Sequence, residues 1–240
     1  MNENKNYIVF GAILGLSLII SAGIGSFTFL NVRSGESISS TGSAKKAVTS
    51  DKVKWTSSIT RATTANTLKV GYAKMDSDLK EVRSFMTTNG IVEKDLIIST
   101  IYLNEVYEQY PQADKKYNLV QNIEINSTDV NKIAELSKNT NSLIIDKGIF
   151  FSTNAVEYYY SKLPEARIEL LASAVGDAKA RAEQLAIAGG KTIGALKSAS
   201  SGVVQVMAPN SVEVSDYGVY DTSKIEKEIF VTVKATFGIK

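Results

Sequence analysis

The chain has 240 residues, of which 44% are hydrophobic and 22% are charged, and its 27 Lys and Arg side chains nearly balance 25 Asp and Glu side chains. The net charge of +2 gives no electrostatic reason to expect a nucleic-acid partner. Because the chain contains no Cys and no His, it has no disulfide, no thiolate nucleophile, no Ser-His-Asp triad and no ordinary His-based metal site.

The N-terminal segment is apolar and carries no charge between Lys5 and Arg33. Residues 7–30 are long enough, at about 1.5 Å per residue, to cross a hydrocarbon core of about 30 Å. We therefore expect a transmembrane anchor at 7–30, after a short cytoplasmic tail at 1–6 and before a linker at 31–37. A cleavable signal segment is the alternative, because small residues follow Ile20. Lys5 precedes the segment and a large body follows it, which favours an N-terminus inside the cell and an exported body.

The first part of the body predicts a strand and a long helix. Apolar and polar side chains alternate over residues 53–62, as in a half-buried strand with Val53, Trp55, Ser57 and Ile59 on one side. Residues 63–88 then place apolar side chains at steps of three and four, and Asn89-Gly90 ends the pattern. The expected core stripe of this helix is Leu68, Tyr72, Met75, Leu79, Val82 and Phe85.

The middle of the body predicts a hairpin and a short helix. Residues 95–110 and 116–126 have strand character and are separated by a polar turn at 111–116. Ser127 or Thr128 is then expected to cap a short helix. The apolar face of that helix is Val130, Ile133, Ala134 and Leu136. Residues 143–161 contain one or two further strands.

A second long helix is predicted from Pro164 to about Ala188, because proline suits the first turn of a helix. Its expected packing face is Ile168, Leu171, Ala172, Val175, Ala178, Ala182, Leu185 and Ala186. Residues 192–206 and 225–239 predict strands, separated by an exposed loop at 208–224. This order of elements predicts an α+β fold, in which an antiparallel or mixed sheet packs with two long helices and one short helix.

The stretch Gly189-Gly190-Lys191-Thr192 is similar to the end of a phosphate-binding loop. Such a loop requires another glycine five residues before Gly190, where Leu185 stands. It also lies before a helix, whereas these glycines follow one. We therefore expect the two glycines to form a helix C-cap and expect no nucleotide site.

Seven acidic residues are candidates for catalysis or metal binding. The first long helix carries Asp76, Asp78 and Glu81 on one face. The predicted hairpin carries Glu105 and Glu108, and the last strand carries Glu226 and Glu228, two residues apart. A solvated helix face, a hairpin rim and a solvated sheet edge explain them more simply than a Ca²⁺ site or an acid pair. We expect no catalytic residue, no metal and no cofactor.

Five tyrosines are the candidate residues for a subunit interface. In Tyr158-Tyr159-Tyr160 the side chains must alternate between the two faces of a strand. Burial within the sheet explains the run, and a subunit interface is the alternative, because tyrosine is enriched at interfaces. Tyr217 and Tyr220, in the loop, are further candidate interface anchors.

The stretch "DAKARAEQLAIAGGKTIGALKSAS" and an opening pattern upstream of it carry a family resemblance. The residues that match are Asp177, Ala178, Arg181, Ala182, Leu185, Ala186, Gly190 and Gly194, with Gly42, Ala44, Val48, Asp51 and Val53 upstream. The closing strand "IFVTVKATFGI" and the loop before it match as well. From about Ile38 to Ile239, the chain resembles the SIMPL-domain family, also called DUF541.

This resemblance implies a bacterial cell-envelope protein with an export or anchor segment and an α+β fold. In some members it implies a ring-like or channel-like homo-oligomer, and some members are linked to oxidative-stress tolerance. The family has no established catalytic residues, so none is carried over. We expect a non-enzymatic, self-assembling protein whose domain over 38–240 lies outside the cytoplasm, periplasmic or at the cell surface. The alternatives are a binding module for a small molecule or peptide, and a hydrolase that uses carboxylates.

Overall fold

The computed structural model describes residues 3–33, 36–107, 114–212 and 215–240. The chain divides into two compact units. The first unit contains residues 1–44, 171–202 and 232–240, and the second contains residues 45–170 and 203–231. Each unit therefore joins segments that are far apart in the sequence.

The N-terminal segment forms one helix, α1 (Glu3–Arg33). Within it, Val9–Phe29 has a mean hydropathy of 2.0, and none of this window is buried inside the structure. The helix is thus long and apolar enough to cross a membrane, as an anchor or as a signal sequence, which confirms the expected segment.

The body alternates strands and helices in the order that an α+β fold requires. Its strands are β1 (Ser37–Thr49), β2 (Lys52–Thr64), β3 (Leu96–Glu105), β4 (Lys116–Ser127), β5 (Phe150–Thr153), β6 (Glu157–Tyr159), β7 (Ile193–Ser201), β8 (Gln205–Met207) and β9 (Glu226–Ile239). Its α-helices are α2 (Leu68–Thr88), α3 (Val130–Leu136), α4 (Asn141–Ile145) and α5 (Leu163–Ala188). Short 3₁₀ turns at Ala65–Thr67 and Glu93–Asp95 precede α2 and β3.

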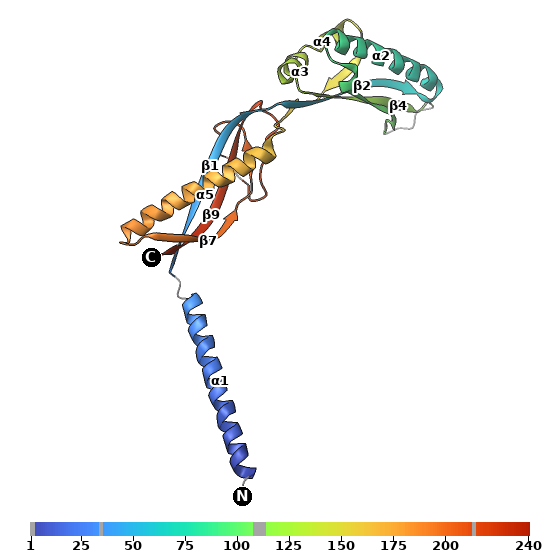
Figure 1. Ribbon diagram of the computed structural model, residues 1–240. Coiled ribbons are helices and arrows are strands. Elements are labelled where there is room, and N and C mark those ends of the chain that lie inside the picture. Colours follow the sequence, from blue (N-terminus) through green and yellow to red (C-terminus); the bar gives the residue numbers. More distant parts are fainter. Residues whose placement is uncertain (1–2, 34–35, 108–113, 213–214) are drawn as a thin grey trace. The chain divides into compact units, whose positions relative to one another are not determined.

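In the first unit, α5 lies along one face of a sheet with the strand order β1-β9-β7 (Figure 1). Alanines spaced four residues apart form the buried side of α5, and Ala178 and Ala182 pack with Ala235 and Phe237 of β9. Because these side chains are small, the helix backbone approaches the sheet closely. At Gly42 of β1, a Cβ atom would overlap the Ala174 carbonyl oxygen and the Ala178 amide nitrogen.

The second unit has a sheet with the order β3-β4-β2-β5, with β6 pairing to β2. The helices α2, α3 and α4 cover one face of it (Figure 1). Trp55 and Ile59 of β2 and Ile123 and Ile125 of β4 point into this core and are at most 1% exposed. The prediction that Trp55 and Ile59 share a buried face is confirmed. Among the described residues, no helix covers the opposite face, which we call the open face (Figure 1).

The predicted hairpin is confirmed as the antiparallel pair β3–β4, with a register shift between Ile98 and Ile101. The end predicted for the second long helix is also confirmed, since α5 stops at Ala188 and Gly190 has a φ of 69°. The Lys191 amide donates to the Ala186 carbonyl at 2.9 Å and closes this cap. The two glycines therefore end a helix, as their order predicted.

Several local predictions were wrong. The Ser-rich residues that form β1 did not predict a strand, and α4 was not predicted. Asp129, and not Ser127 or Thr128, caps α3, and its carboxylate accepts a hydrogen bond from the Lys132 amide at 3.2 Å. The last strand, β9, is not a solvated edge, because it pairs with both β1 and β7.

The predicted packing faces of the two long helices were only partly right. In α5, Ile168 and Leu185 were expected in the core but are 71% and 55% exposed, whereas Ala174 is fully buried. The helix packs too closely for long side chains, so the alanine face is the buried one. In α2, Met75 and Val82 are buried as predicted, while Tyr72 is 37% exposed. The other buried residues of α2 are Gly71, Asp78 and Met86.

A substitution at Gly42 tests the close contact between β1 and α5. We expect Gly42→Ala to lower the free energy of unfolding by about 1–3 kcal/mol or more, because the new methyl group meets helix backbone that cannot move aside. Thermal unfolding followed by circular dichroism measures the change.

The matched control is Gly176→Ala, in the middle of α5, where an added Cβ meets no atom within 4 Å. This change should raise the free energy of unfolding by about 0.5–1 kcal/mol, since alanine is the better helix former. Equal effects of the two substitutions would contradict the close contact.

Candidate functional site

The residues that carry the sequence pattern at 177–190 hold α5 against β1. The Asp177 carboxylate accepts a hydrogen bond from the Ser43 amide at 2.8 Å and forms an ion pair with Arg181 at 2.9 Å. Ser40 of β1 also holds the α5 backbone, because its hydroxyl donates to the Ala178 carbonyl at 2.6 Å. The amide of Ser43, and then the Arg181 guanidinium, lower the pKa of the Asp177 carboxyl.

The upstream pattern has a similar structural role in the second unit. The Asp51 carboxylate accepts hydrogen bonds from the Ser161 amide at 2.7 Å and from the Ser161 hydroxyl at 2.6 Å. It therefore fixes the turn that follows β6 next to the start of β2. The polar residues of both patterns, Asp51, Asp177 and Arg181, thus form contacts that hold the fold together.

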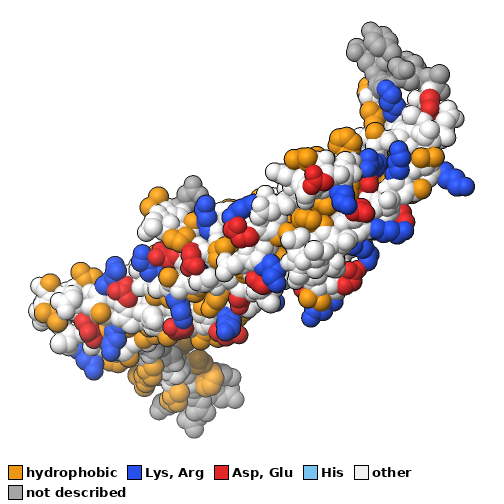
Figure 2. All heavy atoms as spheres, turned by 90° about the horizontal axis from the view of Figure 1, so that it is seen from above, with side chains coloured by type: hydrophobic (Ala, Val, Ile, Leu, Met, Phe, Trp, Pro, Cys, Tyr) orange, Lys and Arg blue, Asp and Glu red, His pale blue; other side chains and the backbone are white. Residues whose placement is uncertain are grey.

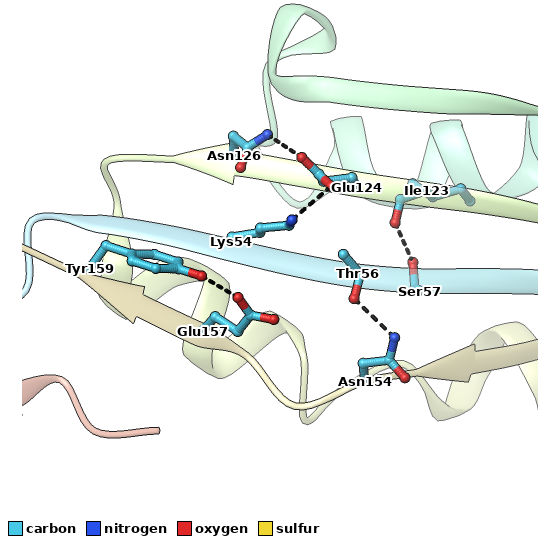
Figure 3. A network of polar contacts seen from close by, with 9 residues as sticks. All are labelled: Lys54, Thr56, Ser57, Ile123, Glu124, Asn126, Asn154, Glu157 and Tyr159. Atoms are coloured by element: carbon cyan, nitrogen blue, oxygen red, sulfur yellow. Dashed lines mark hydrogen bonds and ion pairs between the residues drawn. The ribbon is translucent and has the colours of Figure 1, made fainter. Parts of the chain in front are cut away.

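Three of the candidate tyrosines come together beside β6. The rings of Tyr159 and Tyr220 lie 5.9 Å apart between centroids, and the Tyr160 amide donates to the Tyr220 hydroxyl at 2.8 Å. The Tyr159 hydroxyl donates to the Glu157 carboxylate on the same face of the strand (Figure 3). The hydrogen bond to Glu157, together with burial, raises the pKa of Tyr159 to about 12.

The other two candidate tyrosines lie apart from this cluster. Tyr158 points to the opposite face of β6 and packs against the core of the second unit, as the alternation predicted. Tyr217 is 96% exposed. Tyr158, Tyr159, Tyr160 and Tyr220 are therefore partly buried by contacts within the chain, and Tyr217 is the most exposed of the five.

A buried lysine next to the cluster was missed by the sequence analysis. Lys227 of β9 is 1% exposed, and its ammonium donates to the carbonyl oxygens of Asp221 and Lys224, the latter at 2.7 Å. The ammonium also lies 5.6 Å from the centre of the Tyr220 ring. Burial lowers the pKa of Lys227, and the charge of Asp221 opposes this effect. Lys227 ties the 217–224 loop to the start of β9.

This residue had a signal in the sequence. It stands at an alternate position of the last strand, in register with the buried Ile229 and Val231. A polar residue at a core position of a regular strand requires a partner, and here the partners are loop carbonyls. The strand pattern could have identified Lys227 but not those partners.

Five of the seven candidate carboxylates are paired with a cation, each with a different one. Asp78 is buried, not solvated as predicted, and forms a two-point ion pair with Arg61, in which Nη2 and Oδ1 are 2.8 Å apart. Four other pairs are Asp76–Lys80, Glu81–Lys147, Glu105–Lys115 and Glu228–Lys45. Glu226 accepts a hydrogen bond from Thr49 at 3.0 Å, and Glu108 lies outside the described residues.

Comparison with known proteins adds one finding. The sequence model of the SIMPL family, described as "Protein of unknown function (DUF541)", matches residues 38–237. A search of curated proteins gave no match. The matched range starts inside β1 and ends inside β9, so it includes the contact between Gly42 and α5.

Replacement of Asp177 should change how stability depends on pH. The pKa of Asp177 is lower in the folded chain than its ordinary value of 3.8, so its contribution to stability is present above that pH and is lost as the pH falls through the folded pKa. We expect Asp177→Asn to lower the melting temperature at pH 7 and to differ less from the wild type at pH 3.

The control is Glu183→Gln on the same helix, where the ion pair with Lys179 is 3.8 Å long and exposed. It should have a smaller effect at pH 7, because exposed pairs within one helix contribute little. An equal loss in both variants, or a difference for Asp177→Asn that persists unchanged in acid, would contradict the assigned role.

Replacement of Lys227 should loosen the loop that it holds. We expect Lys227→Met to lower the free energy of unfolding by about 1–3 kcal/mol, because two loop carbonyls lose their donor. Limited proteolysis should then cut faster within residues 217–224. Lys234→Met, at an exposed position of the same strand, is the control and should leave the cutting rate unchanged. Identical digestion of the two variants would show that Lys227 does not hold the loop.

Proposed function

Because the chain belongs to the SIMPL family, we propose that it is a membrane-anchored protein whose domain lies outside the cytoplasm and self-associates without catalysing a reaction. In this proposal residues 1–6 remain in the cytoplasm, residues 7–30 cross the membrane, and residues 38–240 form the exported domain. The observation that carries the proposal is the exposed apolar helix α1, which ends at Arg33, only a few residues before β1 begins.

The charge pattern supports this orientation. Lys5 precedes the apolar window, and a body of about 200 residues follows it. A short, positively charged tail favours retention on the cytoplasmic side, while the body is translocated.

A non-catalytic role is supported by the chemistry of the chain. The sequence has no Cys and no His. Five of its candidate carboxylates are each paired with a different cation, as Asp78 is with Arg61 and Glu105 with Lys115. Such an arrangement stabilises a fold and does not bring two acids together for general acid–base chemistry.

Self-association is supported by apolar side chains on exposed surfaces of the second unit. A row of cross-strand neighbours crosses the open face of its sheet from β5 to β3. The row runs from Phe150 through Thr60 and Val120 to Tyr102. Phe150 and Tyr102 at the ends of this row are 69% and 49% exposed. Tyr217 adds an exposed aromatic ring. On the face drawn in Figure 2, positive and negative side chains are interspersed, with apolar side chains between them.

A second candidate function is the capture of a small molecule. It is favoured by a pocket of about 430 Å³ in the second unit, which lysine side chains line. Binding and self-association do not exclude each other, and each has its own test.

The solution mass of residues 36–240 tests self-association. Removing α1 opens no core, because none of its apolar window is buried. Light scattering on a sizing column should give a discrete multiple of the monomer mass, and Phe150→Ser or Tyr217→Ser should reduce it.

The matched control is Tyr72→Ser, a partly exposed aromatic on α2, on the helix-covered side of the sheet. It should leave the mass unchanged. A monomer at all concentrations would overturn self-association of the domain.

A further inference from the structure

A pocket at one end of the second unit's sheet combines unpaired cations with hydroxyl groups. It has a volume of about 430 Å³ and lies where β2 begins, β4 ends and β6 runs alongside. Its polar lining includes Lys52, Lys54, Lys94, Asn126, Ser127 and Thr128. Because β4 lies between β3 and β2, Lys94 and Lys52 reach the pocket from opposite sides of that strand.

The three lysines are not equivalent. Lys54 forms an ion pair with Glu124 at 3.2 Å, and Asn126 donates to the same carboxylate at 2.7 Å (Figure 3). Within the part of the chain that the structure describes, Lys52 and Lys94 form no ion pair, and both are exposed. Two ammonium groups are therefore available to an anion. Flexible lysine side chains bind phosphate groups readily, as compact point charges with several donors.

The remaining lining is suited to hydroxyl groups rather than to a second anion. Asp95 lines the pocket with a carboxylate, which accepts hydrogen bonds from hydroxyls and repels an anionic group. The Ser127 hydroxyl accepts a hydrogen bond from the Asp129 amide at 3.1 Å and keeps its own proton to donate. Thr128 adds an exposed hydroxyl.

One wall of the pocket is held in place by contacts outside it. Tyr159 lines the pocket, and its hydroxyl is bonded to Glu157 while its ring lies 5.9 Å from that of Tyr220. The ring therefore offers a fixed apolar surface, on which a carbon skeleton can pack. The volume of about 430 Å³ exceeds the needs of a lone phosphate and falls in the range of small-molecule sites.

We propose that this pocket binds a phosphate ester of a sugar or polyol, with the phosphate between Lys52 and Lys94 and the hydroxyls toward Asp95, Ser127 and Thr128. The inference deepens the second candidate function, on which it rests, and is independent of self-association. The same chemistry occurs in soluble sugar phosphates and in the glycerol phosphate of a lipid headgroup, and the probes below separate these sources.

Calorimetric titration of the full chain in detergent micelles tests the proposal. The probes are glucose 6-phosphate, inorganic phosphate, glucose and a short-chain phosphatidylglycerol. Glucose 6-phosphate should bind more tightly than inorganic phosphate, and Lys52→Gln with Lys94→Gln should weaken it about tenfold or more. Thr128→Val should weaken glucose 6-phosphate while leaving inorganic phosphate unchanged.

The control is the double variant Lys69→Gln and Lys74→Gln, which removes two exposed charges from α2 and should leave binding unchanged.

Tighter binding of the short-chain lipid than of glucose 6-phosphate would assign the site to a headgroup, and the reverse to a soluble ester. Binding of glucose as tight as that of its phosphate would keep a binding function and overturn the phosphate assignment. Failure of every probe at millimolar concentration, or equal weakening by the two double variants, would overturn the site itself. None of these results bears on the solution mass, which alone decides self-association.

Discussion

The fold of the first unit depends on the close approach of α5 to β1. Gly42 leaves no room for a side chain between the strand and the helix backbone, and the alanines of α5 keep the two surfaces at that distance. A close approach also excludes water, so the polar groups at the contact need internal partners. Asp177 and Ser40 provide them, through the Ser43 amide and the Ala178 carbonyl. The family pattern in this region is thus the pattern of one helix–strand contact.

The second unit is stabilised in a different way, with consequences for function. Large apolar side chains such as Trp55 and Ile123 fill its core, and a sheet of this kind tolerates variation on its uncovered face. The surfaces on which our two proposals rest belong to this unit: the row from Phe150 to Tyr102, the exposed Tyr217 of the loop before β9, and the lysine-lined pocket.

The sequence predicted the elements better than their packing. The alternation of β2, the hairpin and the glycine cap of α5 follow from local periodicity and turn chemistry, which short-range rules capture. The face of α5 was misassigned because hydrophobicity favours Ile168 and Leu185, whereas the contact selects small residues that fit against Gly42. Lys227 was missed for a related reason, since its loop partners are joined to it only by the tertiary fold. The lysine pocket likewise draws on three strands and a turn that no local pattern connects.

The polar side chains beside the pocket differ in whether contacts within the described chain already satisfy them. Tyr159 and Tyr220 were attractive candidates, yet their hydroxyls serve Glu157 and the Tyr160 amide, so they shape a wall rather than capture a ligand. Lys52 and Lys94 differ, because their ammonium groups line a pocket and meet no carboxylate within the described residues. Two like charges near one pocket favour an anion, because the anion interacts with both of them. In our proposal, a charge that the chain itself satisfies, as at Asp177, has a structural role, whereas the charges of these two lysines are left for a bound anion.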